Sequence, residues 1–327
     1  MFLPFLLYWS WRNVPLQPVF DSLRQLSIAQ IIILICLNVG LLILFSIRWW
    51  LILRFYGYTI PLHKLSMYRT ASFAISFLTP GPQFGGEPLQ VHALNTRHQI
   101  SEPAVIASVI LDKTIELLVN FTFLGFAAAL VLSSGVVTDL TLLRIGSASF
   151  FVILIPVFYL ILIIQKVKPL TLLWKIIGHW FSNTEKFDQI VENLSRIEDQ
   201  VQSFAISQPK YFLLIFGVSL LVWVGIVFEY WLSFYFLGLN LLIPELLFVM
   251  LAARLALLLP MPGGIGVLEA SQVLALQFMG LNPSFGVSFM VLARGRDFMI
   301  AASGVIFALL LTRTPAHSDN WVNAKYR

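Results

Sequence analysis

One motif, a Pro-Gly pair followed by five residues and a glutamate, occurs twice in this chain. The two copies are Pro80–Glu87 and Pro262–Glu269, and both interrupt segments that are otherwise apolar. Proline and clustered glycines break a helix. A carboxylate inside an apolar membrane segment is costly and is therefore a candidate for function. Two broken helices with a buried acid in each are typical of membrane transporters, which bind their substrates at such breaks.

The scarcity of charged residues indicates the surroundings of these motifs. Of 327 residues, 58% are apolar and only 11% are charged, with a mean hydropathy of +0.86. A soluble domain carries about 25% charged residues, so this composition predicts an all-α, polytopic membrane helix bundle. The net charge of +5 fits basic residues on cytoplasmic loops better than a nucleic-acid partner. The single cysteine, Cys36, excludes disulfides within the chain and cysteine metal clusters.

Apolar segments of two lengths organise the chain. Segments long enough to cross roughly 30 Å of hydrocarbon are Ile28–Leu53, Ala104–Leu132, Ile145–Gln165, Tyr211–Leu237 and Pro283–Thr312. Shorter segments flank the two breaks, Leu65–Leu78 with Glu87–Asn95 and Leu246–Leu259 with Ile265–Met279. We expect each short pair to form a re-entrant hairpin, which is tolerated only where protein or water surrounds the break. Residues 1–27 are predicted to form a partial or interfacial segment, and their sequence leaves open whether they cross the membrane.

The similarity between the two halves extends beyond the glycines. Trp50-Leu51 with Phe55 and Gly57 is matched, at the same spacing, by Trp231-Leu232 with Phe236 and Gly238. Counting crossings makes the second copy run opposite to the first, which predicts an inverted repeat of residues 28–165 and 211–313. The alternative is that the two Pro-Gly segments are unrelated breaks between transmembrane helices and that the halves are not a repeat.

Basic residues orient the predicted bundle. Arg48, Arg54, Lys64, Arg69 and Arg97 fall on the same side as Lys166, Lys168, Lys175 and Lys210, and as the polar tail at 314–327. The positive-inside rule makes this side cytoplasmic, with the C-terminus inside, in the cytoplasmic membrane of a bacterium or archaeon. We place Arg48 and Arg54 with neighbouring aromatic residues in an interfacial belt.

Residues 166–210 are predicted to be a cytoplasmic amphipathic connector. Within it, apolar residues from Phe187 to Phe204 recur at intervals of three and four, which indicates an amphipathic helix. Such a helix either lies on a membrane surface or a partner, or simply connects the two halves.

At these motifs the chain resembles the lysylphosphatidylglycerol synthase/flippase transmembrane family, in its stand-alone form. Leu259–Ala270 is similar to the family's PGGxGxxE signature, Pro80–Glu87 to its PGxxGE element, and Asp112-Lys113 with Glu116 to its acidic-basic-acidic helix start. The resemblance covers about residues 28–312 and implies a domain that moves or handles polar lipids. This chain departs from the family pattern at Gln90, where arginine is frequent. We also expect no attached synthase domain, and hence no synthesis of aminoacyl lipids.

Charged residues inside apolar segments are the candidate substrate-binding groups. They are Glu87, Asp112, Glu116, Arg254, Glu269, Arg294 and Asp297, and the hairpin breaks are Pro80, Gly81, Gly85, Gly86, Pro262, Gly263, Gly264 and Gly266. Arginine suits a lipid phosphate because its planar fork binds two oxygens and stays charged. Lys113, Glu229 and Arg296 also lie in such segments. For each charge the alternative is a structural ion pair, and we expect Lys113 and Arg296 either to pair or to snorkel toward the interface. We expect Glu87, Glu269 and Arg254 to converge in one cavity.

Three classes of function are compatible with this pattern. The first is a flippase or transporter of a polar, phosphate-bearing lipid bound between the two broken hairpins. The second is a membrane enzyme, although the chain has no HExxH, P-loop or GxSxG motif and no metal spacing among its histidines. The third is an accessory scaffold for lipid head-group or glycan-lipid modification, with a lipid-synthesising enzyme as partner. We expect no cofactor, no metal and no nucleic acid. The head group, coupling ion and oligomeric state are not determined by the sequence.

Overall fold

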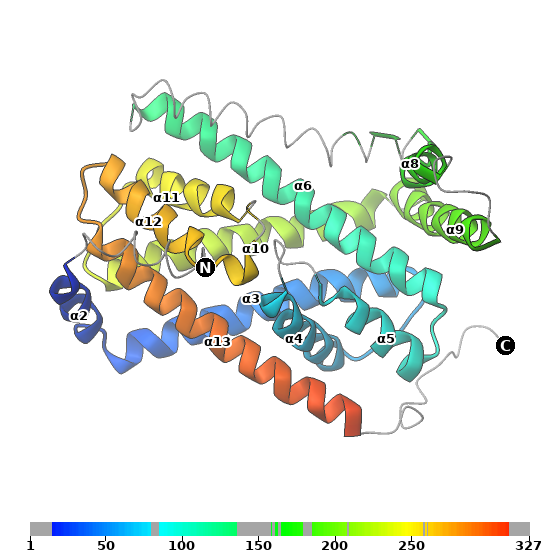
Figure 1. The fold of residues 1–327 in the computed structure, drawn as a ribbon, viewed down its shortest axis with the longest axis horizontal. Coiled ribbons are helices and arrows are strands. Elements are labelled where there is room, and N and C mark those ends of the chain that lie inside the picture. Colours follow the sequence, from blue (N-terminus) through cyan, green and yellow to red (C-terminus); the bar gives the residue numbers. More distant parts are fainter. Residues whose placement is uncertain are drawn as a thin grey trace.

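The structure is a computed structural model, and it describes residues 15–79, 85–135, 158, 161–162, 165–178, 185–207, 209–257, 259 and 261–313. All regular structure in these residues is helical, as predicted (Figure 1). The α-helices are α2 (Leu16–Arg24), α3 (Ile28–Phe55), α4 (Leu62–Leu78), α5 (Glu87–His98), α6 (Glu102–Ser134), α8 (Pro169–Gly178), α9 (Glu185–Ser207), α10 (Pro209–Phe236), α11 (Ile243–Ala256), α12 (Val267–Phe278) and α13 (Ser284–Arg313). A short 3₁₀ helix, η1, covers Pro262–Gly264.

The long helices run along the longest axis of the molecule (Figure 1). Within the described residues, α3, α6 and the Lys210–Phe236 part of α10 are long and apolar enough to cross a membrane. Helix α13 has 30 residues and is also long enough at about 1.5 Å per residue, but it carries three charged residues near its middle. The chain is thus an integral membrane protein. The predicted span Ile145–Gln165 and residues 1–14 lie largely or wholly outside the described residues.

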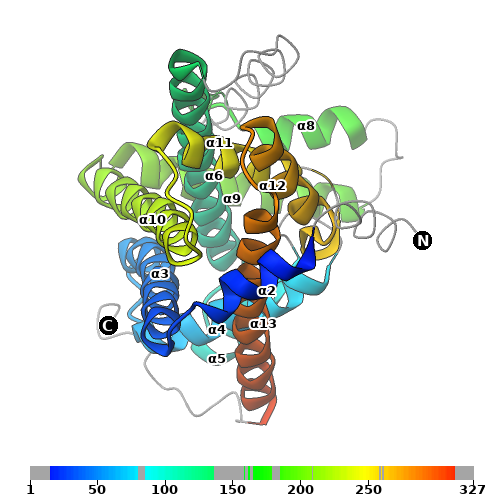
Figure 2. The same ribbon diagram turned by 90° about the vertical axis from the view of Figure 1, so that its left-hand side faces the viewer.

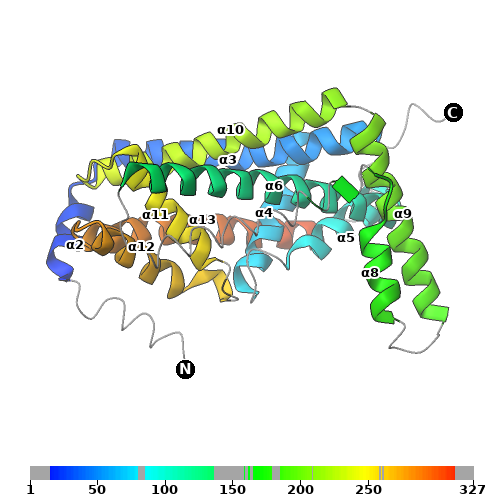
Figure 3. The ribbon, with the colours of Figure 1, turned by 90° about the horizontal axis from the view of Figure 1, so that it is seen from above.

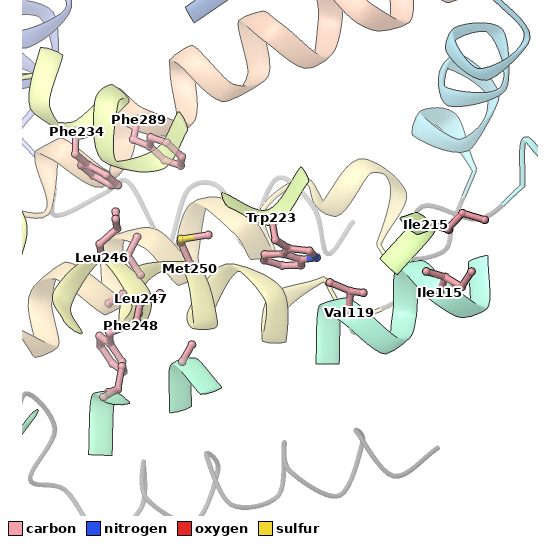
Figure 4. Packing of buried hydrophobic residues seen from close by; sticks show 14 of the residues in the cluster. Ile115, Val119, Ile215, Trp223, Phe234, Leu246, Leu247, Phe248, Met250 and Phe289 are labelled. Carbon is pink, nitrogen blue, oxygen red and sulfur yellow. The ribbon is translucent and has the colours of Figure 1, made fainter. Parts of the chain in front are cut away.

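The helices pack around one main core. Helix α3 lies beside α10, and α4 lies beside α13. Figure 4 shows side chains of α6, α10, α11 and α13 meeting in this core, where Phe234 and Phe289 stack with ring centroids 4.7 Å apart. Exposed apolar side chains such as Ile32, Leu213 and Leu309 lie on α3, α10 and α13, which gives the bundle an outer surface suited to lipid.

A glycine allows α13 to approach α4 closely. A Cβ atom added at Gly304 would lie 2.2 Å from the backbone oxygen of Thr70, so the two helices pack backbone against backbone there. Small residues permit such crossings in membrane helices, where tight packing drives association.

Each Pro-Gly motif separates two helices, as the sequence predicts. Helix α4 ends at Leu78 and α5 begins at Glu87, while α11 ends at Ala256 and α12 begins at Val267. Gly263, Gly264 and Gly266 have φ angles of 56°, 63° and 86°, a region that residues with a Cβ rarely adopt. Pro80, Gly81 and the residues up to 84 lie outside the described residues.

The two helix pairs occupy opposite ends of the long axis but meet at their breaks. Figure 3 shows α11 and α12 toward one end and α4 and α5 toward the other. Gly263 lies against Phe77, whose ring would be 3.2 Å from an added Cβ. The second motif therefore touches the end of the helix that leads into the first.

Two elements lie across the ends of the bundle. Figure 2 looks along the long axis and shows α2 crossing in front of α13. Helix α2 buries Val19 and Ser22, and Ser22 Oγ lies 2.7 Å from Ser288 Oγ of α13. At the opposite end, α9 packs against α6, and its Ile197, Val201 and Phe204 are buried in the main core. The C-terminal part of the α9 stripe is therefore internal, whereas Ile190, nearer the start of the helix, is 40% exposed.

Candidate functional site: two buried charge networks

The first network joins α3 and α4 to α6. Arg48 donates to Asp112 from Nε (2.6 Å) and Nη2 (3.1 Å), and its Nη2 also donates to Glu116 (2.7 Å). Arg69 donates to Asp112 at 2.8 Å. The side chain of Arg48 is only 2% exposed. Such pairs need several hydrogen bonds to offset desolvation, and this geometry supplies them.

The arrangement corrects one expectation. Arg48 is not in an interfacial belt with Arg54, because Asp112 and Glu116 of α6 hold its guanidinium inside the bundle. Arg54 does have the predicted aromatic contact, since its guanidinium carbon lies 4.2 Å from the ring centroid of Trp50.

Lys113 lies between two carboxylates. Its Nζ is 3.5 Å from Glu87 Oε1, at the start of α5, and 3.8 Å from Glu116 Oε2. Both distances exceed those of a close charged hydrogen bond. Lys113 therefore bridges the first break and the Arg48 network without a tight contact to either carboxylate.

The second network joins α10 and α12 to α13. Arg296 pairs with Glu229 and, at 2.9 Å, with Asp297, so it forms the predicted ion pairs. Arg294 Nε donates to Glu269 Oε1 at 2.7 Å, and its Nη1 donates to the carbonyl oxygen of Gly263 at 2.7 Å. This network ties the second break to α13.

The two motif glutamates make the same pair of contacts. Glu87 Oε2 accepts the backbone N–H of Gly85 at 2.7 Å, and Glu269 Oε2 accepts that of Gly266 at 2.7 Å. In each case the other oxygen faces a cation, Lys113 or Arg294, on the long helix that follows. Each glutamate thus binds the backbone of its own Pro-Gly break through one oxygen and pairs with a cation of the following long helix through the other.

Arg254 of α11, which is partly buried, differs from the other cations of the bundle. Its guanidinium carbon lies 4.7 Å from the ring centroid of Trp223. Among the described residues, no carboxylate lies within 4 Å of its nitrogens and no hydrogen bond satisfies them. It has electrostatic interactions with Glu116 of the first network and with Glu229 and Arg296 of the second. Arg254 therefore lies between the networks without completing an ion pair with either.

A groove of about 700 Å³ lies between α5 and α6. Its apolar walls include Val91, Ile106 and Ile110, and polar groups lie at the Glu87–Lys113 pair and at Asn95 and Glu102. Of the three residues expected in one cavity, Glu87 lines this groove and Arg254 and Glu269 do not.

Two members of the first network were not among the predicted binding residues. Arg48 and Arg69 were assigned to the cytoplasmic surface, although Arg69 lies inside the predicted apolar segment Leu65–Leu78. That position is the signal that could have identified Arg69. For Arg48 the sequence offers only its place at the edge of a span, because its partners lie 64 and 68 residues away.

Comparisons with known proteins identify related sequences. A family model described as "Lysylphosphatidylglycerol synthase TM region" matches residues 2–304. A "UPF0104 membrane protein" of Methanothermobacter thermautotrophicus is 24% identical over 298 residues, covering 87% of this chain and 86% of that protein. No solved structure matches.

Proposed function

This chain belongs to the lysylphosphatidylglycerol synthase TM region family, and from that premise we propose that it transports a polar, phosphate-bearing lipid across the cytoplasmic membrane. The observation that carries the proposal is Arg254, a cation inside the bundle without a carboxylate partner among the described residues.

Arg254 is suited to a phosphate for chemical reasons. A guanidinium stays charged, and its planar fork can donate to two phosphate oxygens. A charge that is removed from water without a partner is costly, so an anion that reaches Arg254 gains a strong interaction. The phosphate of a membrane lipid is such an anion and is already present in the bilayer. Trp223 then supports the guanidinium from one face.

The groove between α5 and α6 offers a route for a lipid. Its apolar walls suit a hydrocarbon chain, while Glu87 and Lys113 suit a polar head group. Leu117 lines the groove and also packs in a cluster with Leu255, the neighbour of Arg254 in the chain. A head group that moves past Lys113 therefore approaches the space between the two networks.

In this proposal the two helix pairs are re-entrant hairpins of an inverted repeat, and the substrate binds between them. The shared contacts of Glu87 and Glu269 support this, as does the position of the pairs at opposite ends of the long axis (Figure 3). Rocking of one repeat against the other would expose such a site to each side in turn. The long contacts of Lys113 with Glu87 and Glu116 suit an exchange of partners during that movement.

The proposal is tested in liposomes that contain the purified chain and a head-group-labelled phospholipid. We expect transfer between leaflets without chemical change of the lipid, and we expect Arg254→Gln to lower the rate at least tenfold. Arg54→Gln is the matched control, since Arg54 also lies over a tryptophan but at the end of α3. Transfer at the native rate by folded Arg254→Gln protein would overturn the assigned role of Arg254.

Other outcomes of the same assay favour the other classes. Conversion of the lipid head group would indicate a membrane enzyme. The absence of both transfer and conversion, followed by activity when a lipid-synthesising enzyme is added, would indicate an accessory scaffold.

A further inference from the structure

Helices α8 and α9 form a pair that runs across the long helices. In Figure 1 the pair lies at the end of the bundle where α6 begins. In Figure 3 it extends sideways past the other described helices, with α8 on the side of α9 nearer the middle of the long helices. In a membrane-spanning bundle, this direction places the pair parallel to the bilayer, with α8 on the bilayer side.

Aromatic contacts show where the α8–α9 pair lies along the length of the bundle. Phe204 of α9 packs on Phe55 at the end of α3, with ring centroids 4.7 Å apart, and Tyr56 donates a 3.0 Å hydrogen bond to the carbonyl oxygen of Gln200. Tyr211, at the start of α10, also contacts Phe55. Aromatic residues at helix ends are typical of the membrane–water interface, so the pair lies at that level.

The orientation of α8 is determined by α9. Glu198, which is fully buried, accepts hydrogen bonds from the backbone N–H groups of Leu170 (2.7 Å) and Thr171 (3.0 Å) and from the Thr171 hydroxyl (2.6 Å). Lys168 donates at 2.7 Å to both Ser195 and Asp199. These contacts fix one face of α8 against α9, so the opposite face cannot rotate inward.

That opposite face is apolar and exposed. The side chains of Leu172, Leu173 and Ile176 are 53%, 54% and 59% exposed. Ile176 is four residues after Leu172 and three after Leu173, so the three side chains lie on one side of the helix. Lys175 is exposed beside them, and the described α8 carries no acidic residue. An apolar face flanked by a cation is typical of helices that lie in a membrane interface.

We propose that α8 inserts this apolar face into the adjacent membrane leaflet, with Lys175 at the level of anionic head groups. The bilayer is the occupant favoured by three observations: the position of the pair at the end of the bundle, the side on which α8 lies, and the presence of Lys175 without an acidic residue in the described α8. Contact with a membrane surface, one of the two roles considered for the Phe187–Phe204 stripe, is thus assigned to α8, because Ile197, Val201 and Phe204 of that stripe pack inside the protein. This inference does not depend on transport.

Site-directed spin labelling tests the insertion, and the single cysteine makes it practical. Native Cys36 is exposed on α3 and provides the lipid-facing reference. In a Cys36→Ser background, Leu173→Cys reports on α8 and Asn193→Cys, at an exposed position of α9, provides the water-facing control. The labelled full chain is placed in vesicles of phosphatidylglycerol and phosphatidylcholine, and label collisions with oxygen and with a water-soluble nickel chelate are measured.

We expect the label at 173 to resemble that at Cys36, with at least threefold higher collision rates with oxygen than with nickel, and the label at 193 to show the reverse. Lys175→Glu should move the label at 173 toward water in anionic vesicles but not in pure phosphatidylcholine. A label at 173 that is open to nickel overturns the proposal. So does a label shielded from both reagents, since that would show a protein partner or a second copy on this face.

Discussion

Glu87 and Glu269, in motifs from opposite halves of the chain, each bind a glycine N–H of their own break at 2.7 Å and each face a cation on the following long helix. The strengths differ, because the Glu269–Arg294 pair is 2.7 Å long and the Glu87–Lys113 pair is 3.5 Å long. The tighter contact belongs to the more buried glutamate. We infer that the second Pro-Gly break is held more tightly to its long helix than the first, and that Glu87 can exchange Lys113 for another partner more easily than Glu269 can exchange Arg294.

The Glu269–Arg294 pair leads to a first prediction. We expect Glu269→Gln to abolish lipid transfer while the protein still inserts, and to destabilise it by about 3 to 5 kcal/mol because Arg294 is left buried without its carboxylate. The free energy of unfolding in detergent micelles measures this cost. Adding Arg294→Gln should recover part of the loss, since it removes the uncompensated charge. A strictly additive double variant would contradict the pairing.

A second prediction concerns the network of Arg48. Arg48→Ala should lower the free energy of unfolding by about 3 to 5 kcal/mol, because it leaves Asp112 and Glu116 with fewer cations in a buried site. Arg54→Ala, six residues along the same helix, should cost no more than about 1 kcal/mol, since it removes only an exposed cation–π contact. Equal costs for the two variants would mean that the buried network does not stabilise the bundle.

The crossing of α13 and α4 gives a third prediction. Gly304→Ala should lower the thermal midpoint by several degrees, because its Cβ would lie 2.2 Å from the Thr70 oxygen and the helices would have to separate. Gly295→Ala, on the same helix, has nothing within 4 Å of the added carbon. It should be neutral or slightly stabilising, since alanine favours a helix over glycine by about 1 kcal/mol.

Topology provides a fourth prediction, which tests the re-entrant hairpins directly. In a Cys36→Ser background, we expect Asn95→Cys to react with a membrane-impermeant reagent from the cytoplasmic side and Leu281→Cys to react from the outside. Asn95 lies in the last turn of α5, and Leu281 lies three residues beyond the end of α12. Labelling in intact cells and in inverted vesicles separates the sides. Reaction of Asn95→Cys from outside would exclude a hairpin that returns to the cytoplasmic side.

The sequence alone determined the class of the protein and the places where its helices break. Both are local properties. In lipid each backbone group must be satisfied within its own helix, so apolar length identifies a span, and proline with clustered glycines identifies a break. The glutamates of the two motifs could be identified for the same reason, because an acid in an apolar segment stands out wherever it packs.

Tertiary structure decided which charges neutralise one another and which remain available. Arg48 and Asp112 are 64 residues apart in the chain, yet they form a 2.6 Å contact, and no local pattern predicts it. Arg254 and Arg294 are both arginines in apolar helices, but packing gives Arg294 a carboxylate and gives Arg254 a tryptophan ring. Likewise, α9 has the longer amphipathic pattern, but α8 has the exposed apolar face, because the bundle covers Ile197, Val201 and Phe204 of the α9 stripe. Ion pairing and exposure depend on which helices become neighbours, and that choice is made by the packing of the whole bundle.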